Sequence, residues 1–173
     1  MKDLREKVEK ERTLLKKIEL AIPGFRGYRK REDLRIADSM LRDYIARILD
    51  DVEKYTKIVR ENIASEMLLD EMESIGKIVN RVSKIDTEVR HAEQGYMGLV
   101  GDYSVDTEQL NNLYEFDLTL IEGAKELLNF AQNMVEERDL SRLREMMQGF
   151  LEKLDEFEEY FRKRRDMMLE VFT

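Results

Sequence analysis

The sequence predicts an all-α fold, an up-down-up-down four-helix bundle of long helices with an additional shorter N-terminal helix, with residues 1–173 as a single domain. Apolar residues recur at intervals of three and four along most of the chain, and this spacing buries one face of a helix. The chain is 42% apolar and 39% charged, a mixture typical of long amphipathic helices. One Pro and eight Gly leave few positions for turns, so we expect long helices.

The first helix is expected over residues 2–21, although Glu11 interrupts its apolar face. Pro23 ends this helix, because the residue before a proline is pushed out of the helical conformation. The second helix has the clearest periodicity. Its apolar residues advance by threes and fours: Leu34, Ala37, Leu41, Ile45, Ile48, Val52, Tyr55, Val59 and Ile63.

The apolar stripe resumes at Leu68, but its phase has slipped relative to the stripe that ends at Ile63. One straight helix would turn its apolar face away here, since each residue rotates the helix by about 100°. We therefore predict a break between Glu61 and Glu66, with Ser65 as the N-cap of a third helix.

Two further helices complete the predicted bundle. Asp106 or Thr107, at the end of a glycine-rich stretch, is expected to begin a fourth helix that runs to about Glu137. Asp139 or Ser141 is expected to begin a fifth. The short connections predict that consecutive long helices are antiparallel neighbours.

Two segments rich in glycine and aromatic residues interrupt the helices, PGFRGY at 23–28 and GYMGLVGDY at 95–103. In an up-down bundle both lie at one end, and the basic run RKRR at 162–165 returns to that end. Glycine lets backbone approach a partner, aromatic rings anchor it, and arginine binds carboxylate or phosphate. The candidate binding residues are Phe25, Arg26, Tyr28, Arg29, Lys30, Arg31, Arg35, Tyr96 and Tyr103.

A purely structural interpretation of this end stays open beside the binding interpretation. Glycine supplies the backbone angles of tight turns, and aromatic rings can cover the end of a hydrophobic core. Arginine near the C-terminus of a helix complements the helix dipole.

Two polar residues fall on inward faces of the predicted helices. Asp117 lies between Leu113 and Ile121 in the fourth helix, and Arg164 follows Phe161 in the fifth. Antiparallel pairing brings the two close together, so we predict a structural ion pair between them rather than a catalytic acid.

The same pairing argument places Asp86 near Arg42 of the second helix.

Composition excludes several classes of function. The net charge of −8 disfavours general nucleic-acid binding, because phosphate neutralisation needs a basic face. Without cysteine there are no disulfides, thiolate metal ligands or catalytic thiols. No stretch resembles a signal peptide or a membrane span, so a cytoplasmic protein is expected. Few Asn and Gln beside abundant Glu, Lys and Arg are typical of thermophile proteins.

Metal and nucleophile signatures are also missing. Glu88 and His91 form one Glu-x-x-His motif, but a di-iron bundle needs two such motifs, and the chain has one histidine. The serines lack a nucleophile elbow, and GYMGLVG lacks the Lys-Ser/Thr ending of a phosphate-binding loop. We therefore assign no catalytic residue, metal or cofactor.

The stretches IPGFRGYRKREDLRIADSMLRDYIA and GYMGLVGDYSVDTEQLNNLYEFD resemble two segments of a family of small prokaryotic helical proteins that carries no assigned activity. In that family the first segment reads Ile-Pro-Gly-aromatic-x-Gly-Tyr, and the second reads close to Gly-Tyr-x-Gly-Leu-Phe, from which Val100 departs. The resemblance implies a helical fold with two shared segments and no particular chemistry.

These observations together favour a non-enzymatic helical adaptor or scaffold. Its glycine-aromatic, basic end would bind an acidic protein or peptide, or anionic membrane headgroups. The alternative is an enzyme or small-ligand binder with a pocket between segments 23–28 and 95–103. A homo-oligomer is compatible with both.

Overall fold

The computed structural model of the protein describes residues 2–29, 31–92 and 106–172, and the side chains of 3–29, 33–92 and 106–170. Throughout these residues the fold is all-helical, which confirms the predicted class. The five helices are α1 (Lys2–Ala21), α2 (Arg31–Ser65), α3 (Leu69–His91), α4 (Thr107–Glu136) and α5 (Leu140–Phe172).

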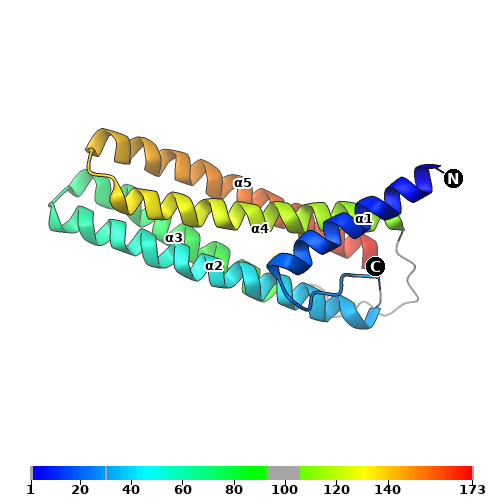
Figure 1. Cartoon of the computed structure of the whole chain (residues 1–173). Coiled ribbons are helices and arrows are strands. Elements are labelled where there is room, and N and C mark those ends of the chain that lie inside the picture. The colour runs from blue at the N-terminus through cyan, green and yellow to red at the C-terminus, as the bar shows by residue number, and fades with distance from the viewer. Residues whose placement is uncertain (1, 30, 93–105, 173) are drawn as a thin grey trace.

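Four long helices pack side by side, and α1 lies across one of them (Figure 1). α2 packs against α3 and α4, α5 packs against α4 and α3, and α1 packs against α4. The α2–α3 and α4–α5 connections lie at one end of the molecule, at the left in Figure 1. The beginnings of α2 and α4 and the C-terminus lie toward the other end.

The hydrophobic core follows the apolar stripes of the four long helices. Leu41, Ile45 and Leu49 of α2 are fully buried, as are Phe150 and Leu154 of α5. α1 contributes less: Ile18 is its buried apolar residue, while Leu4 and Leu20 are mostly exposed. α1 is therefore a peripheral helix on a bundle core that the other helices build.

The turn between α1 and α2 follows from Pro23 and two glycines. The Ile22 amide still donates to the Ile18 carbonyl, and the chain then leaves the helix. Gly24 and Gly27 have φ angles of 90° and 80°, which side chains disfavour. The turn directs the rings of Phe25 and Tyr28 into the core, where both are buried.

The existence of the break predicted from the phase slip is confirmed, but α2 continues to Ser65 and α3 begins at Leu69, so the break lies later than the predicted range of Glu61 to Glu66. The prediction of Ser65 as an N-cap is wrong. Ser65 belongs to the last turn of α2, where its hydroxyl donates to the Asn62 carbonyl, and Leu68 occupies the N-cap position.

The beginnings of the last two helices agree with the capping signals. Asp106 is the N-cap of α4, and the Gln109 side chain accepts a hydrogen bond from its amide. Asp139 precedes α5, and its carboxylate accepts from the Arg142 amide.

Candidate functional site

Arg164 is the centre of a buried polar cluster formed by Tyr28, Asp38, Arg42, Asp117 and Arg164. Its Nε donates to Asp117 Oδ1 at 2.6 Å, and its Nη1 donates to Asp38 Oδ1 at 2.7 Å. The third guanidinium nitrogen, Nη2, lies 3.0 Å from the Tyr28 hydroxyl. This confirms the ion pair predicted between Asp117 and Arg164, and shows that it belongs to a larger network.

Tyr28 ties the α1–α2 turn to this cluster. Its hydroxyl donates to Asp117 Oδ2 at 2.7 Å, so both oxygens of that carboxylate have a partner. Its amide donates to the Tyr114 hydroxyl at 3.1 Å, and the two rings stack with centroids 5.6 Å apart. Phe25 packs edge-on against the Tyr28 ring.

Gly27 permits this close approach. A Cβ atom at Gly27 would lie 2.3 Å from the Tyr114 hydroxyl oxygen, so a larger residue would displace the ring. The turn therefore needs glycine at this position for both its positive φ and its space.

Arg42 extends the cluster to the end of α3. Its Nε donates to Asp38 Oδ2 at 2.8 Å, and its Nη1 donates to the Arg90 carbonyl at 3.0 Å. The expectation that Arg42 lies near α3 is correct, but its partner there is backbone at the helix C-terminus. Asp86 instead accepts from Arg90.

The cluster is balanced in formal charge, with two carboxylates, Asp38 and Asp117, and two guanidiniums, Arg42 and Arg164. Burial raises the pKa of the Asp117 carboxyl, while Arg164 and Tyr28 act in the opposite direction. Burial, followed by the Asp117 charge, raises the pKa of the Tyr28 phenol, and burial raises the pKa of Tyr114 to about 12. Among the described residues each charge of the network is paired with an opposite one, which suits a structural role better than proton transfer.

Another buried acid lies beside the cluster. Glu11, which interrupts the apolar face of α1, is buried and accepts two hydrogen bonds from Arg29, at 2.5 and 2.6 Å. The pair joins α1 to the turn that follows it. Hydrogen bonding to Glu11 raises the pKa of Arg29, so this arginine stays charged.

Polar contacts also hold α1 on α4, beside the apolar packing of Ile18, Leu14 and Leu15. Lys7 pairs with Glu108 at 3.0 Å and Lys10 pairs with Glu115 at 2.6 Å, both at the surface. The Asn111 side chain is buried below α1 and donates to the Lys7 carbonyl, while its own oxygen has no partner among the described residues.

The structure corrects the predicted binding set. Phe25 and Tyr28 are buried, so neither ring is an exposed anchor, because a tight turn places them in the core rather than over it. Arg29 is engaged with Glu11. The expected contact between the two loops, and Tyr96 and Tyr103 with it, lie outside the described residues. The side chains of Lys30 and Arg31 do as well.

Two predicted binding residues remain accessible. The Arg26 side chain is 78% exposed, and it pairs with Asp33 at 4.0 Å. Arg35 is exposed on the second turn of α2. Of the C-terminal basic run, Arg162 and Arg165 are exposed, and Lys163 pairs with Glu159 at 2.7 Å.

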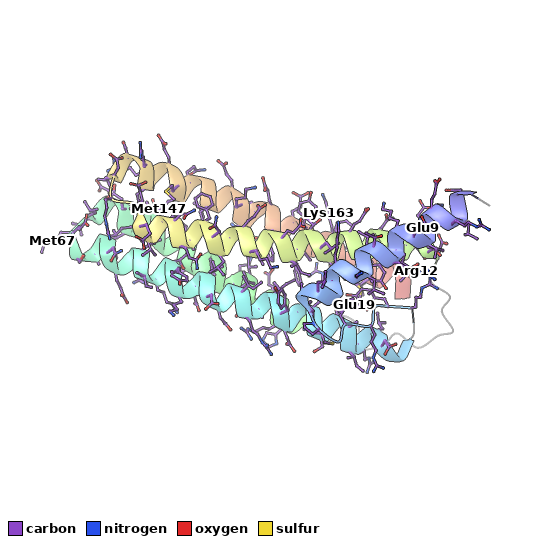
Figure 2. All side chains as sticks on the ribbon, viewed as in Figure 1. Glu9, Arg12, Glu19, Met67, Met147 and Lys163 are labelled. Atoms are coloured by element: carbon purple, nitrogen blue, oxygen red, sulfur yellow. The ribbon has the colours of Figure 1, made fainter. Side chains whose placement is uncertain are left out.

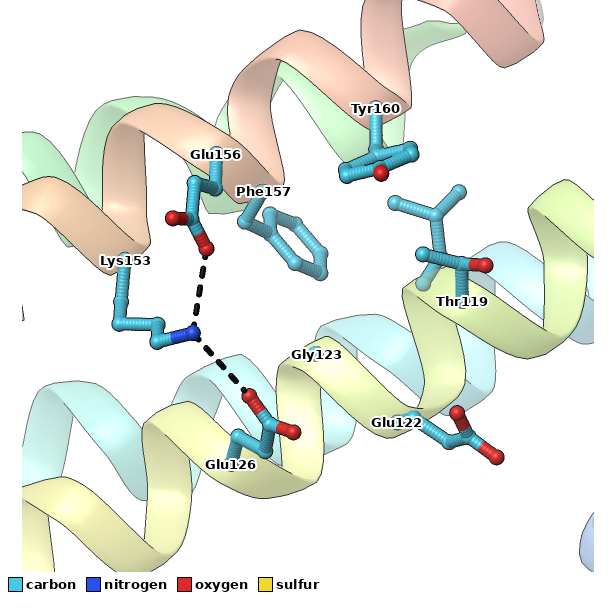
Figure 3. A pocket seen from close by; sticks show the side chains of 9 residues that line it. Thr119, Glu122, Gly123, Glu126, Lys153, Glu156, Phe157 and Tyr160 are labelled. Carbon is cyan, nitrogen blue, oxygen red and sulfur yellow. Dashed lines mark hydrogen bonds and ion pairs between the residues drawn. The ribbon is translucent and has the colours of Figure 1, made fainter.

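A shallow pocket lies between α4 and α5 (Figure 3). Phe157 and Tyr160 face Thr119 and Gly123 across it. At its edge, Lys153 bridges the carboxylates of Glu156 and Glu126, at 3.1 and 3.7 Å. Lys153 is already paired with two surface carboxylates, so the residues that line this pocket offer an anionic ligand no unpaired cation.

Metal chemistry finds no support in the part of the chain that the structure describes. No three acidic or histidine side chains there are grouped to hold an ion. Glu88 pairs with Lys84 at 3.4 Å, and His91 is exposed at the end of α3. Among the described helices, none is both long enough and apolar enough to span a bilayer.

Comparison of the chain with models of protein families, with curated proteins and with solved structures gives no match. The resemblance to a family of small helical proteins therefore stays an expectation.

The residues of this cluster differ in how clearly the sequence marks them as buried. Asp117 and Arg164 stood out because each interrupts an apolar stripe. Asp38 lies beside the stripe, and its only signal is the i,i+4 spacing to Arg42. Tyr28 lies in a turn, where no periodicity marks a residue as buried.

Proposed function

We propose that the protein is a non-enzymatic helical adaptor that binds an acidic protein or peptide through the basic surface formed by Arg26 and Arg35. The observation that carries this proposal is the exposure of Arg26 in a turn that the buried cluster holds in place. A fixed backbone presents the guanidinium in a defined position, which lowers the entropy lost on binding. As part of this proposal, the four long helices run in up-down-up-down order and the protein is cytoplasmic.

The position of the arginines supports a role outside folding. Arg35 is exposed on the second turn of α2, where a surface charge contributes little to stability. Arg26 gains little from a carboxylate 4.0 Å away at an exposed site. Neither Arg26 nor Arg35 is therefore explained by local stability, whereas both are suited to recognising carboxylates on a partner.

The proposal is tested with a fluorescent peptide of alternating Glu and Ala, and with the matching Lys and Ala peptide as control. Fluorescence anisotropy is measured for the native protein, for Arg26→Glu/Arg35→Glu, and for Arg47→Glu/Arg60→Glu. The last variant has the same net charge change at exposed positions elsewhere on α2.

We expect the first variant alone to lose affinity for the acidic peptide, by about tenfold or more at low salt, and native binding to weaken as salt rises. Equal loss in both variants, or binding indifferent to salt, would contradict the proposal. Anionic and zwitterionic phospholipid vesicles provide separate arms. Vesicle binding without peptide binding would assign the surface to membrane headgroups instead.

The alternative small-ligand function has its own readout. A specific ligand stabilises the folded state by mass action, so it raises the midpoint of thermal unfolding in a metabolite screen. A ligand that raises this midpoint equally in the native protein and in Arg26→Glu/Arg35→Glu would favour the alternative.

A further inference from the structure

The two connections at the far end of the bundle differ in chemistry. In the α4–α5 connection, Glu137 accepts from the amides of Arg138 and Asp139, both at 2.8 Å, and Asp139 accepts from the Arg142 amide at 2.9 Å. In the α2–α3 connection, residues 66–68, the N-cap position of α3 is Leu68, and no side chain caps the helix. One connection thus follows the usual capping rules, and the other does not.

Met67 has a backbone conformation that ordinarily belongs to glycine. Its φ is 57°, and it is the only non-glycine residue with positive φ in the described part of the chain. The Leu68 amide donates to the Ile63 carbonyl at 3.2 Å and the Met67 amide to the Ala64 carbonyl at 3.1 Å, the pattern of a Schellman motif. A side chain in this conformation costs about 1–2 kcal/mol.

The apolar side chains of this connection face solvent. Met67 is 83% exposed and Leu69 80%, while Leu68 between them packs against the core. Figure 2 shows Met67 at the extreme end of the molecule. The chain therefore combines an unfavourable backbone angle with two exposed apolar side chains at one place. The left-handed conformation closes the C-terminus of α2 through the Schellman hydrogen bonds, but glycine would do so without strain, and the two exposed side chains bury little apolar surface. Backbone strain of this kind concentrates at functional sites.

Carboxylates border these side chains. Glu66 and Asp70 flank them in sequence and are exposed, as is Glu61 one turn before the end of α2. The neighbouring connection adds exposed Asp139, although Arg138 beside it offsets part of that charge. An acidic border disfavours an anionic membrane and favours a surface with basic residues.

We propose that Met67 and Leu69, bordered by Glu66 and Asp70, form a knob that docks into an apolar socket rimmed by Lys or Arg on a partner protein. Methionine suits this role because its unbranched side chain adapts to the shape of a socket. The knob lies at the opposite end of the bundle from the beginning of α2, which follows the turn that carries Arg26. It goes beyond the function proposed above, since it gives the adaptor a second binding end for a partner of opposite charge.

The experiment uses a display library of a small three-helix scaffold whose surface positions vary among apolar residues, Lys, Arg, Asp and Glu. Clones are selected on the native protein, and their affinities are then measured for Met67→Gly, Glu66→Lys/Asp70→Lys and Leu20→Ser. Met67→Gly removes one of the two side chains of the knob while relieving its backbone, so it folds. Leu20→Ser is the matched control, because Leu20 is 78% exposed on α1.

We expect the enriched clones to carry apolar residues surrounded by Lys or Arg, and to lose at least tenfold in affinity for Met67→Gly and for the charge-reversed variant. Leu20→Ser should bind as the native protein does. Acidic clones that bind Arg26 and Arg35 are set aside by their unchanged affinity for Met67→Gly. Equal binding of the basic-rimmed apolar clones to Met67→Gly, or no enrichment of such clones, would overturn the proposal. Because Arg26 and Arg35 are unchanged in every variant, these outcomes leave the Glu/Ala peptide test unaffected.

Two other partners for the knob, a second copy of this protein and a lipid surface, are each tested by a separate measurement. Sedimentation of the native protein over a range of concentrations detects a second copy, and zwitterionic vesicles detect a lipid surface. Self-association or vesicle binding that disappears in Met67→Gly would assign the knob to that occupant and overturn the partner proposed here.

Discussion

Arg164 on α5 and Asp117 on α4 lie 47 positions apart in the chain, and their Nε and Oδ1 atoms are 2.6 Å apart with both side chains fully buried. Around this pair the structure brings together the α1–α2 turn, α2, α4 and α5. A buried charge is stable only when paired, so the pair requires all of these elements to be in place together.

Replacing Asp117 by Ala should destabilise the protein by roughly 3 kcal/mol or more, because Arg164 and the Tyr28 hydroxyl lose a buried partner. Chemical denaturation measures this loss. In a double-mutant cycle with Arg164→Met, the combined loss should be smaller than the sum of the single losses. Additive losses would show that the two residues do not interact.

Gly27→Ala should destabilise the protein, since alanine meets both a φ of 80° and the Tyr114 hydroxyl at 2.3 Å. The backbone part alone is about 1–2 kcal/mol. In a Tyr114→Phe background the same change should cost less, because the closest contact is gone. If Gly27→Ala lowers the free energy of unfolding equally in both backgrounds, the contact with the Tyr114 hydroxyl is not the cause of the loss.

Met67→Gly should stabilise the protein by about 1 kcal/mol, because glycine adopts φ near 57° without strain. Met67→Ala serves as the control, since it removes the same exposed side chain but keeps the strained backbone. The midpoint of thermal unfolding should therefore rise for the glycine variant only. Equal midpoints for the two variants would contradict this origin of the strain.

Arg29 and Arg26 should respond differently to charge reversal, although they are three positions apart. Arg29→Glu leaves the buried Glu11 carboxylate without its partner and beside a like charge, which should cost roughly 1–3 kcal/mol. Arg26→Glu should change stability by no more than about 0.5 kcal/mol, as its side chain is exposed. Comparable losses by urea denaturation would exclude a special role for the Glu11–Arg29 pair.

Stability should fall at alkaline pH in a window set by Tyr114. An unfolded tyrosine loses its proton near pH 10, whereas folded Tyr114 keeps it to about 12. Between these values the unfolded state binds fewer protons, so the free energy of unfolding decreases as pH rises. Tyrosinate absorbance should show a late-titrating component that Tyr114→Phe reduces. An unchanged late component in that variant would contradict the assignment.

Periodicity was sufficient to predict the helices and one of the buried ion pairs. The stripe of α2 and its phase slip predicted a break between Glu61 and Glu66 without glycine or proline to mark it, and the break lies at 66–68, a few residues later. The capping role of Ser65 was misjudged because serine also bonds backward within the last turn of a helix. The left-handed Met67 could not be read from its residue type, since glycine is the usual signal.

The candidate site was less accessible to sequence reasoning for a physical reason. Glycine and aromatic residues in a turn are equally compatible with an exposed docking loop and with a turn that buries its rings. Contacts distant in sequence decide between them, here those of Tyr28 with Tyr114 and Asp117. The partner of Glu11 could not be identified either, because Arg29 lies on the far side of the turn.

The central claim is that the buried cluster fixes the α1–α2 turn on the bundle, and amide hydrogen exchange of Tyr28 tests it most directly. This amide lies in a turn and donates to the buried Tyr114 hydroxyl. We expect it to exchange about as slowly as the core amides of α4, and to exchange much faster in Tyr114→Phe and Arg164→Met while α4 stays protected. Rapid exchange of the Tyr28 amide in the native protein, at the rate of an open loop, would contradict the claim.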